Sequence, residues 1–131
     1  MTPRKHDEMM AIVLGHAHFM SIVAADTLEG IGNQSELKAI GGSTFRVLTT
    51  LVESVISEDP ELYATLEMKL PYLIEMEDRF QASSARWARI VRNHDRQTFI
   101  KEMPILKDKF VKENIDFGQA YENMYKIIEW L

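Results

Sequence analysis

Hydrophobic residues recur at three- and four-residue intervals through most of this chain, a spacing typical of helices that bury one face. The clearest case is the stretch His6–Thr27, for which Thr2 and Pro3 supply a helix start and Gly30 and Gly32 a stop. Its large apolar face consists of Met9, Ile12, Val13, His16, Phe19, Met20 and Val23. The pattern predicts one long helix that is buried along this face.

The other face of this helix is built mostly of small residues and carries a histidine. It comprises Asp7, Ala11, Leu14, Gly15, His18, Ser21, Ile22 and Ala25. Small residues around a titratable group either let another backbone come close or leave room for a ligand. His18 is therefore a candidate to hydrogen-bond a ligand, the alternative being a histidine satisfied by a backbone carbonyl. His16, on the apolar stripe, is expected to be a core histidine.

Helix starts and stops punctuate the rest of the chain. The expected capping residues are Ser35, Ser43 or Thr44, Asp59, Asp95 and Asp116. Pro71 should end or kink one helix, and Pro104 should bend or split another. No alternating strand is present, so the pattern predicts an all-α bundle of about six helices in a single domain, 1–131. Two helices, the first and the one from Tyr72, are long for so small a domain, which favours an intertwined homodimer.

Composition narrows the function classes. The chain has 131 residues and a net charge of −5, which argues against nucleic acid or an anionic membrane as the main partner. It has no cysteine, which excludes disulfides and thiolate sites and allows a cytoplasmic location. The longest apolar run is shorter than a membrane span, and no signal peptide is apparent.

Metal and nucleotide motifs are weak. His6–Asp7 and His94–Asp95 are similar to the ligand pairs of metal-dependent HD phosphohydrolases, but that site needs further ligands in a set order. His16 and His18 lie on different sides of an ideal helix and should not share one ion. We therefore predict no metal site, and bound metal would support the phosphohydrolase alternative. Gly30 and Gly32 follow a helix rather than a strand, which excludes a dinucleotide fingerprint.

Arg46 is the second unusual residue, because it lies in the first turn of a helix directly after Gly41–Gly42–Ser43–Thr44. A cation there opposes the helix dipole unless an anion binds between them. The free backbone N–H groups and Arg46 would then converge on that anion. The alternative is a solvated arginine paired with Glu53.

Four segments together resemble the C-terminal helical domain of prephenate dehydrogenases. They are His6–Asp7 with His18–Phe19 on one helix, Gly41–Arg46, Ser57–Tyr63 as an S-x-D-P-x-L-Y helix start, and Asp95–Phe99. The resemblance covers nearly the whole chain, and the order and spacing of the segments are more specific than any one of them.

The resemblance implies a domain that dimerises and contributes to a substrate site. In that family a Rossmann domain, which this sequence does not contain, binds NAD or NADP and holds the catalytic histidine. The full enzyme oxidises and decarboxylates prephenate with NAD or NADP, giving 4-hydroxyphenylpyruvate for tyrosine synthesis, and some members use arogenate. The chain is then a part of a cytoplasmic oxidoreductase of aromatic amino acid biosynthesis, not catalytic alone. Substrate contacts would come from His18, Arg46, Ser43 and Thr44.

One departure from the family pattern concerns the substrate carboxylates. Many members carry an arginine two helical turns after the position of Arg46, where it grips a carboxylate, and this chain has Ser54 there. The loss favours an alternative in which the scaffold is a non-enzymatic dimerisation or effector-binding domain. Retention of His18 and Arg46 favours the enzyme.

Overall fold

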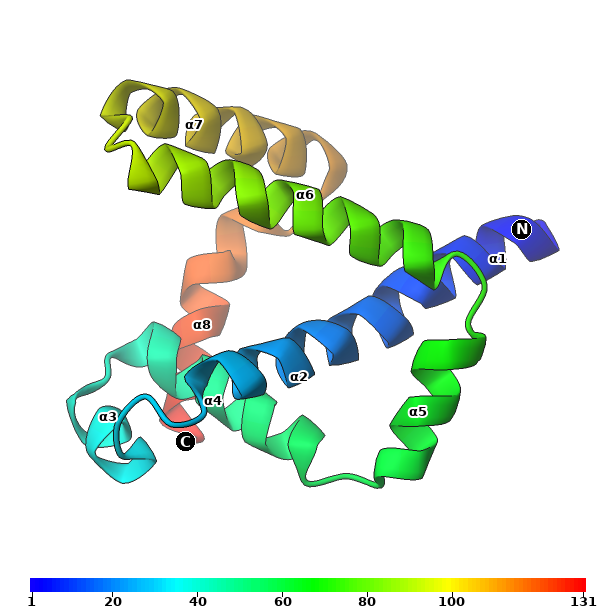
Figure 1. The fold of residues 1–131 in the computed structure, drawn as a ribbon. Helices are drawn as coiled ribbons and strands as arrows, with labels where there is room; N and C mark the ends of the chain where they lie inside the picture. Colours follow the sequence, from blue (N-terminus) through cyan, green and yellow to red (C-terminus); the bar gives the residue numbers. More distant parts are fainter. The chain divides into compact units, whose positions relative to one another are not determined.

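The computed structural model describes all 131 residues and contains seven helices, counting the first continuous stretch once, and no strand (Figure 1). That stretch consists of α1 (Pro3–Met10), a π-helical segment η1 (Ala11–His16) and α2 (Ala17–Leu28). The others are α3 (Gln34–Ile40), α4 (Ser43–Ile56), α5 (Pro60–Lys69), α6 (Leu73–Arg92), α7 (Arg96–Glu113) and α8 (Ala120–Glu129), the last preceded by a short 3-10 turn, η2 (Phe117–Gln119). The expected all-α fold is confirmed.

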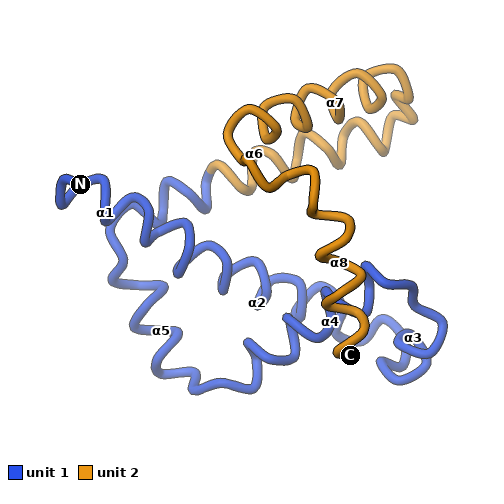
Figure 2. Tube along the Cα trace, turned by 180° about the vertical axis from the view of Figure 1, so that it is seen from behind, with its two compact units in different colours: residues 1–78, 131 blue, residues 79–130 orange.

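The chain divides into two compact units (Figure 2). The first contains residues 1–78 and Leu131, and the second contains residues 79–130. The boundary falls inside α6, so the start of that helix belongs to the first unit and the remainder to the second.

The first helix buries the face opposite to the one that its pattern suggested. Ala11, Gly15 and Ser21, on the small-residue face, are buried together with His16. The side chains of the large apolar face that remain exposed, at between 37% and 59%, are Met9, Ile12, Val13, Met20 and Val23. The expectation that this face is buried is wrong for a single protomer, because the small residues let neighbouring helices approach more closely.

Gly15 is the point of closest approach. A Cβ atom placed there would lie 2.8 Å from Leu73 Cδ1 and 3.0 Å from Leu70 Cδ1. Leu73, the first residue of α6, is itself 2% exposed. The α5–α6 junction therefore packs directly against the backbone of the first helix, and no larger residue fits at that position without displacing it.

The α2 helix packs along α4, and the two run in opposite directions (Figure 1). Ala25 and Leu28 of α2 line one cavity with Thr49 and Val52 of α4. The connecting α3 is capped by Asn33, whose side chain accepts from the N–H groups of Ser35 and Glu36, so the expected Ser35 cap is wrong. Asn33 lies directly before the first helical residue, two residues before Ser35, and its side-chain oxygen is placed to accept from these groups.

The start of α4 differs from the expected cap at Ser43 or Thr44. Gly42 occupies the N-cap position and no side chain caps the helix. Ser43 and Thr44 already belong to the first helical turn, and both are exposed. The first N–H groups of α4 therefore face solvent without a capping side chain.

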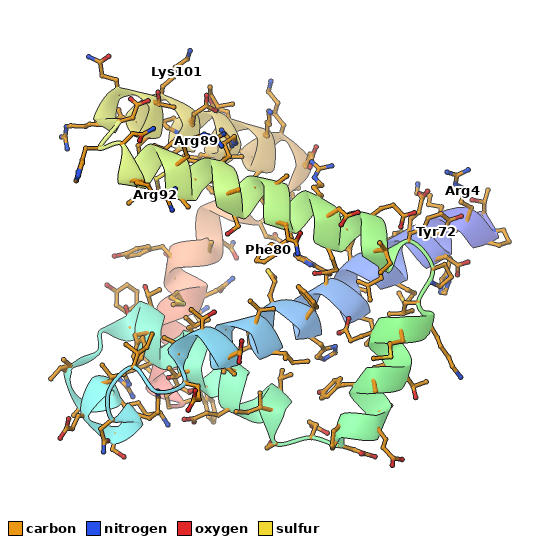
Figure 3. The ribbon with its side chains drawn as sticks, viewed as in Figure 1. Arg4, Tyr72, Phe80, Arg89, Arg92 and Lys101 are labelled. Carbon is orange, nitrogen blue, oxygen red and sulfur yellow. The ribbon has the colours of Figure 1, made fainter.

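The α5 helix begins and ends as predicted. Asp59 caps it by accepting from the N–H of Glu61, and it ends at Lys69, directly before Leu70–Pro71. Tyr72 then adopts a left-handed conformation with φ of 67° as the chain turns into α6. The guanidinium of Arg4 lies 5.6 Å from the centre of the Tyr72 ring, a cation–π contact that joins this turn to α1 (Figure 3).

The second unit is built on the antiparallel pair α6–α7. Trp87 packs edge-on against Phe99, with ring centres 5.2 Å apart. At the turn between the helices, His94 has φ of 52°, and the N–H of Asp95 donates to the carbonyl of Ile90, which forms a Schellman-type helix end. Asp95 caps α7 as predicted, because its carboxylate accepts from the N–H and hydroxyl of Thr98, which lowers the pKa of Asp95.

Pro104 lies inside α7, which is not split there. The expected cap of the last helix at Asp116 is wrong. Asp116 precedes the 3-10 turn η2 and makes no side-chain cap, while α8 starts only at Ala120. A proline costs a helix one N–H donor, and the long flanking segments here continue the helix through it.

By length and composition, the helix Pro3–Leu28 is apolar enough to cross a membrane, a test that core helices of soluble proteins and signal sequences also pass. The expectation that every apolar segment is shorter than a membrane span is therefore wrong, by length and composition, for this 26-residue helix. Of its most apolar window, 22% is buried, so one protomer leaves most of this apolar surface uncovered.

We predict that Gly15→Ala destabilises the protein. Helix propensity alone favours alanine by about 1 kcal/mol, but overpacking a filled site costs about 1–3 kcal/mol. The expected net loss is about 1 kcal/mol in the free energy of unfolding, measured by urea denaturation. Gly118→Ala is the control, since a Cβ there meets nothing within 4 Å. A Gly15→Ala protein more stable than the wild type would contradict the close packing against Leu73.

His94 provides a second test of the backbone. His94→Gly should raise the free energy of unfolding by about 0.5 kcal/mol, since glycine adopts positive φ without strain but loses more entropy on folding. His94→Val should lower it by about 1–2 kcal/mol because a β-branched residue is strained there. Thermal unfolding of the three proteins would reveal the order, and equal stabilities would exclude a strained turn at His94.

Candidate functional site

His18 lies in the first turn of α2, immediately after the π-helical segment. The N–H of Ala17 donates to the carbonyl of Ile12, five residues earlier, which is the bonding pattern of a π-helix. His18 Nδ1 lies 2.5 Å from the carbonyl oxygen of Leu14. A carbonyl oxygen can only accept, so Nδ1 carries a hydrogen and Nε2 remains for another partner. A hydrogen bond to a backbone carbonyl, the alternative expected for His18, thus occupies only one of its two ring nitrogens.

The His18 imidazole also packs against an aromatic ring from α5. The centres of the His18 and Tyr63 rings are 4.9 Å apart, and their planes are inclined by 43°. Burial and the nearby Glu58 carboxylate raise the pKa of Tyr63. The Tyr63 hydroxyl therefore stays neutral near physiological pH and can either donate or accept a hydrogen bond.

His16 is a buried histidine, as predicted, and it has a charged partner. Its Nδ1 lies 2.9 Å from Glu77 Oε1, and the His16 residue is 7% exposed. Glu77 comes from α6, in the part of that helix that belongs to the first unit. The other oxygen of this carboxylate, Oε2, is shielded from solvent and has no hydrogen-bond partner.

Glu67 of α5 is the least satisfied group of this region. Both of its carboxylate oxygens are shielded from solvent without a hydrogen-bond partner. Burial, followed by repulsion from Glu77, raises the pKa of Glu67, while His18 and His16 act in the opposite direction. Because the pKa of Glu67 is higher in the folded protein, protonation of its carboxylate favours folding. The stability that this group contributes is present at low pH and is lost as the pH rises above the usual pKa of a carboxyl group.

A cavity of about 410 Å³ opens next to these groups. Its walls come from α2, α4, α5 and the loop before α5, and consist of Ile22, Val55, Ile56, Glu58, Pro60, Tyr63, Ala64, Glu67 and Met68. Ile22 lies one helical turn after His18 on the same side of α2. We call His16, His18, Tyr63, Glu67 and Glu77 the histidine–glutamate cluster.

Arg46, the centre of the predicted anion site, is a cation without an ion-pair partner in the protomer. Arg46 is half-buried in the first turn of α4, and its guanidinium makes no ion pair within the protomer. The alternative partner, Glu53, is paired with Lys38 of α3 instead. Ser43 and Thr44 lie beside Arg46 in the same uncapped turn. Ser43, Thr44 and Arg46 share the first turn of α4.

His18 and Arg46, however, lie toward opposite ends of the α2–α4 pair. Thr49, one turn after Arg46, lines a cavity with Leu28, whereas Val55 lines the other cavity with Ile22. Ten residues separate His18 from Leu28, which corresponds to about 15 Å along a helix axis. One small ligand therefore does not reach both side chains of the same protomer.

The acidic members of the cluster were not predicted from the sequence. Glu77 is remote from His16 in the chain and no local pattern joins them. Glu67 follows Tyr63 by one helical turn, beside the apolar positions Leu66 and Leu70. A glutamate among the apolar positions of an amphipathic helix was the feature of the sequence that could have identified Glu67. No group of three His, Asp or Glu side chains in the chain converges as a metal site would require.

Comparison with known proteins agrees with this architecture. The model of the prephenate dehydrogenase dimerization domain matches residues 2–105. A probable arogenate/prephenate dehydrogenase of Methanocaldococcus jannaschii is 30% identical over 102 residues, which are 77% of this chain and 23% of that protein. The chain thus spans about a quarter of the length of this relative. No solved structure matches the chain.

The matched region runs from the cap of α1 into α7, and so contains the histidine–glutamate cluster, Arg46 and the exposed apolar face of the first helix. The chain therefore belongs to the prephenate dehydrogenase dimerization domain family.

Proposed function

We propose that this chain is the dimerisation and substrate-binding part of a prephenate or arogenate dehydrogenase. The observation that carries the proposal is the family match over residues 2–105. The chain has no strand and so cannot form the Rossmann sheet on which dehydrogenases hold NAD or NADP. The nucleotide and the hydride transfer then belong to a separate domain, and the isolated chain is inactive as a dehydrogenase.

The exposed apolar face of the first helix is the proposed dimer seam. Met9, Ile12, Val13, Met20 and Val23 form a stripe whose side chains remain between 37% and 59% exposed in the protomer. Such a stripe on a helix of this length is typical of an interface between subunits. Self-association through this face explains why the large residues lie outside the protomer while the small ones lie inside it.

The proposed substrate contacts are His18 and the uncapped turn of Arg46, Ser43 and Thr44. Arg46 is a cation without an ion-pair partner in the protomer, beside free helix N–H groups, and this combination suits a carboxylate. Because His18 of the same protomer lies at the other end of α4, we place Arg46 opposite the cavity of the second protomer in the dimer. Because position 54 is a serine rather than an arginine, we expect Arg46 to bind more of the negative charge of the substrate.

The dimer seam can be tested with Val13→Glu. A charge in an apolar seam should weaken dimerisation on the order of a hundredfold or more, since it is buried without a partner. Sedimentation velocity over a range of protein concentrations measures the dissociation constant. Ile115→Glu is the matched control, because Ile115 is 98% exposed and lies far along the chain from this helix. An unchanged dimer in Val13→Glu would place the seam elsewhere.

The substrate assignment can be tested by calorimetric titration of the chain with prephenate. Arg46→Ala should lower the affinity on the order of tenfold to a hundredfold, through loss of a charge-assisted contact. Arg92→Ala makes the same change on the exposed end of α6 and should leave the affinity unchanged (Figure 3).

Two outcomes would count against this assignment. Equal affinities of the wild type and Arg46→Ala would remove Arg46 from the site. Absence of binding by the wild type, followed by absence of dehydrogenase activity when a matching Rossmann domain is added, would favour the non-enzymatic dimerisation or effector-binding alternative.

A further inference from the structure

The α5 helix is only weakly anchored in the first unit. None of its residues is fully buried, and irregular turns join it to α4 on one side and to α6 on the other (Figure 1). Pro60 is its first residue, and Pro71 lies two residues after its end. A helix with so little buried surface, held between two such junctions, can open locally while the rest of the protein stays folded.

A few contacts hold α5 against the first helix. The side chain of Leu70, directly after α5, approaches the backbone of Gly15, where a Cβ atom would lie 3.0 Å from Leu70 Cδ1. The centre of the Tyr63 ring lies 4.9 Å from that of His18. Glu67 is one helical turn from both Tyr63 and Leu70, and therefore lies on the same side of α5 between the two contacts.

The position of Glu67 suits a neutral carboxyl group better than a carboxylate. Both of its oxygens are shielded from solvent, and neither accepts a hydrogen bond. An ionised carboxylate in such a place costs far more free energy than the neutral acid. The side chain can avoid this cost either by binding a proton or by moving into solvent.

The nearest group on α6 strengthens this effect. Glu77 brings a second carboxylate, whose Oε1 lies 2.9 Å from His16 Nδ1 and whose Oε2 is shielded without a hydrogen-bond partner. Burial, followed by repulsion from Glu77, raises the pKa of Glu67. A protonated Glu67 removes the repulsion between the two carboxylates.

The other titratable groups around Glu67 provide no permanent positive charge. From the first helix, His16 and His18 attract the carboxylate, but only when they are protonated. From α5 itself, Tyr63 contributes a neutral hydroxyl, and the loop before α5 contributes a further carboxylate, Glu58. The cavity between these elements is lined by no lysine or arginine.

We propose that α5 is a pH-dependent latch, which stays closed on the first helix while Glu67 is protonated and opens when Glu67 releases its proton to water, carrying Tyr63 away from His18. The junctions at Pro60 and Pro71 are the hinges of this movement. The latch is defined by groups of this chain alone, so it stands independently of the proposed function. Because His18 is a proposed substrate contact, opening also changes the surroundings of that contact.

Opening of α5 is linked to the release of one proton. In the open form Glu67 is exposed to water, and its pKa returns toward the ordinary value of a carboxyl group. The closed form therefore binds the proton more tightly than the open form does. The open population increases as the pH rises above the ordinary carboxyl pKa, and it levels off once the raised pKa of the closed form is passed.

Hydrogen exchange of the 131-residue chain, followed by mass spectrometry from about pH 4 to about pH 8, tests the latch. Rates are corrected for the intrinsic pH dependence of amide exchange. Amides of residues 60–69 should then exchange on the order of tenfold faster at the upper end, since one unit of pKa difference between the two forms corresponds to a factor of ten. Peptides from α4, which contains buried residues of the same unit, should show no such increase.

Two variants separate Glu67 from other titrating groups. Glu67→Gln keeps the size of the side chain and resembles the protonated form, so α5 should stay protected over the whole pH range. Glu61→Gln makes the same change at an exposed residue of the same helix and should keep the wild-type profile. Circular dichroism checks that both variants fold.

The wild-type profile is decisive even if a variant does not fold. Protection of α5 that does not change with pH would overturn the latch. An equal loss of protection in α4 and α5 would overturn it too, because the whole unit would then open together. An increase in exchange that persists in Glu67→Gln would exclude Glu67 as the group that controls α5.

Discussion

The close approach of the α5–α6 junction to Gly15 is the constraint on which the rest of the first unit depends. With Leu73 against the glycine, the first helix must turn its small-residue face inward. The large apolar residues of the same helix are then left outside, where a second subunit can cover them. A single packing choice at one glycine thus links the interior of the protomer to the apolar surface that we assign to the dimer.

The same approach creates the histidine–glutamate cluster. The π-helical segment that contains Gly15 ends at His16, two residues before His18. The helices packed against this region supply Tyr63, Glu67 and Glu77. Buried carboxylates without partners cost folding free energy, so they are not explained by stability. Glu67 lines a cavity and lies within electrostatic reach of His16 and His18, in the part of the chain that we propose binds substrate.

The separation of Arg46 from the cavity beside His18 follows from the antiparallel packing of α4 on α2. Arg46 lies at an uncapped helix start, while the far end of α4, at Ser54 and Val55, borders that cavity. Each of the two cavities along this helix pair has two glutamates in its wall.

The sequence by itself determined the helices, most of their boundaries and the family. Caps such as Thr2, Asp59 and Asp95 act within a few residues, so their effect can be predicted locally. The tertiary structure alone decided which face of the first helix is buried, that Asn33 rather than Ser35 caps α3, and that His16 meets Glu77. It also decided that His18 and Arg46 of one protomer lie apart. These outcomes depend on contacts between residues distant in the chain, where backbone separation and packing, rather than periodicity, set the result.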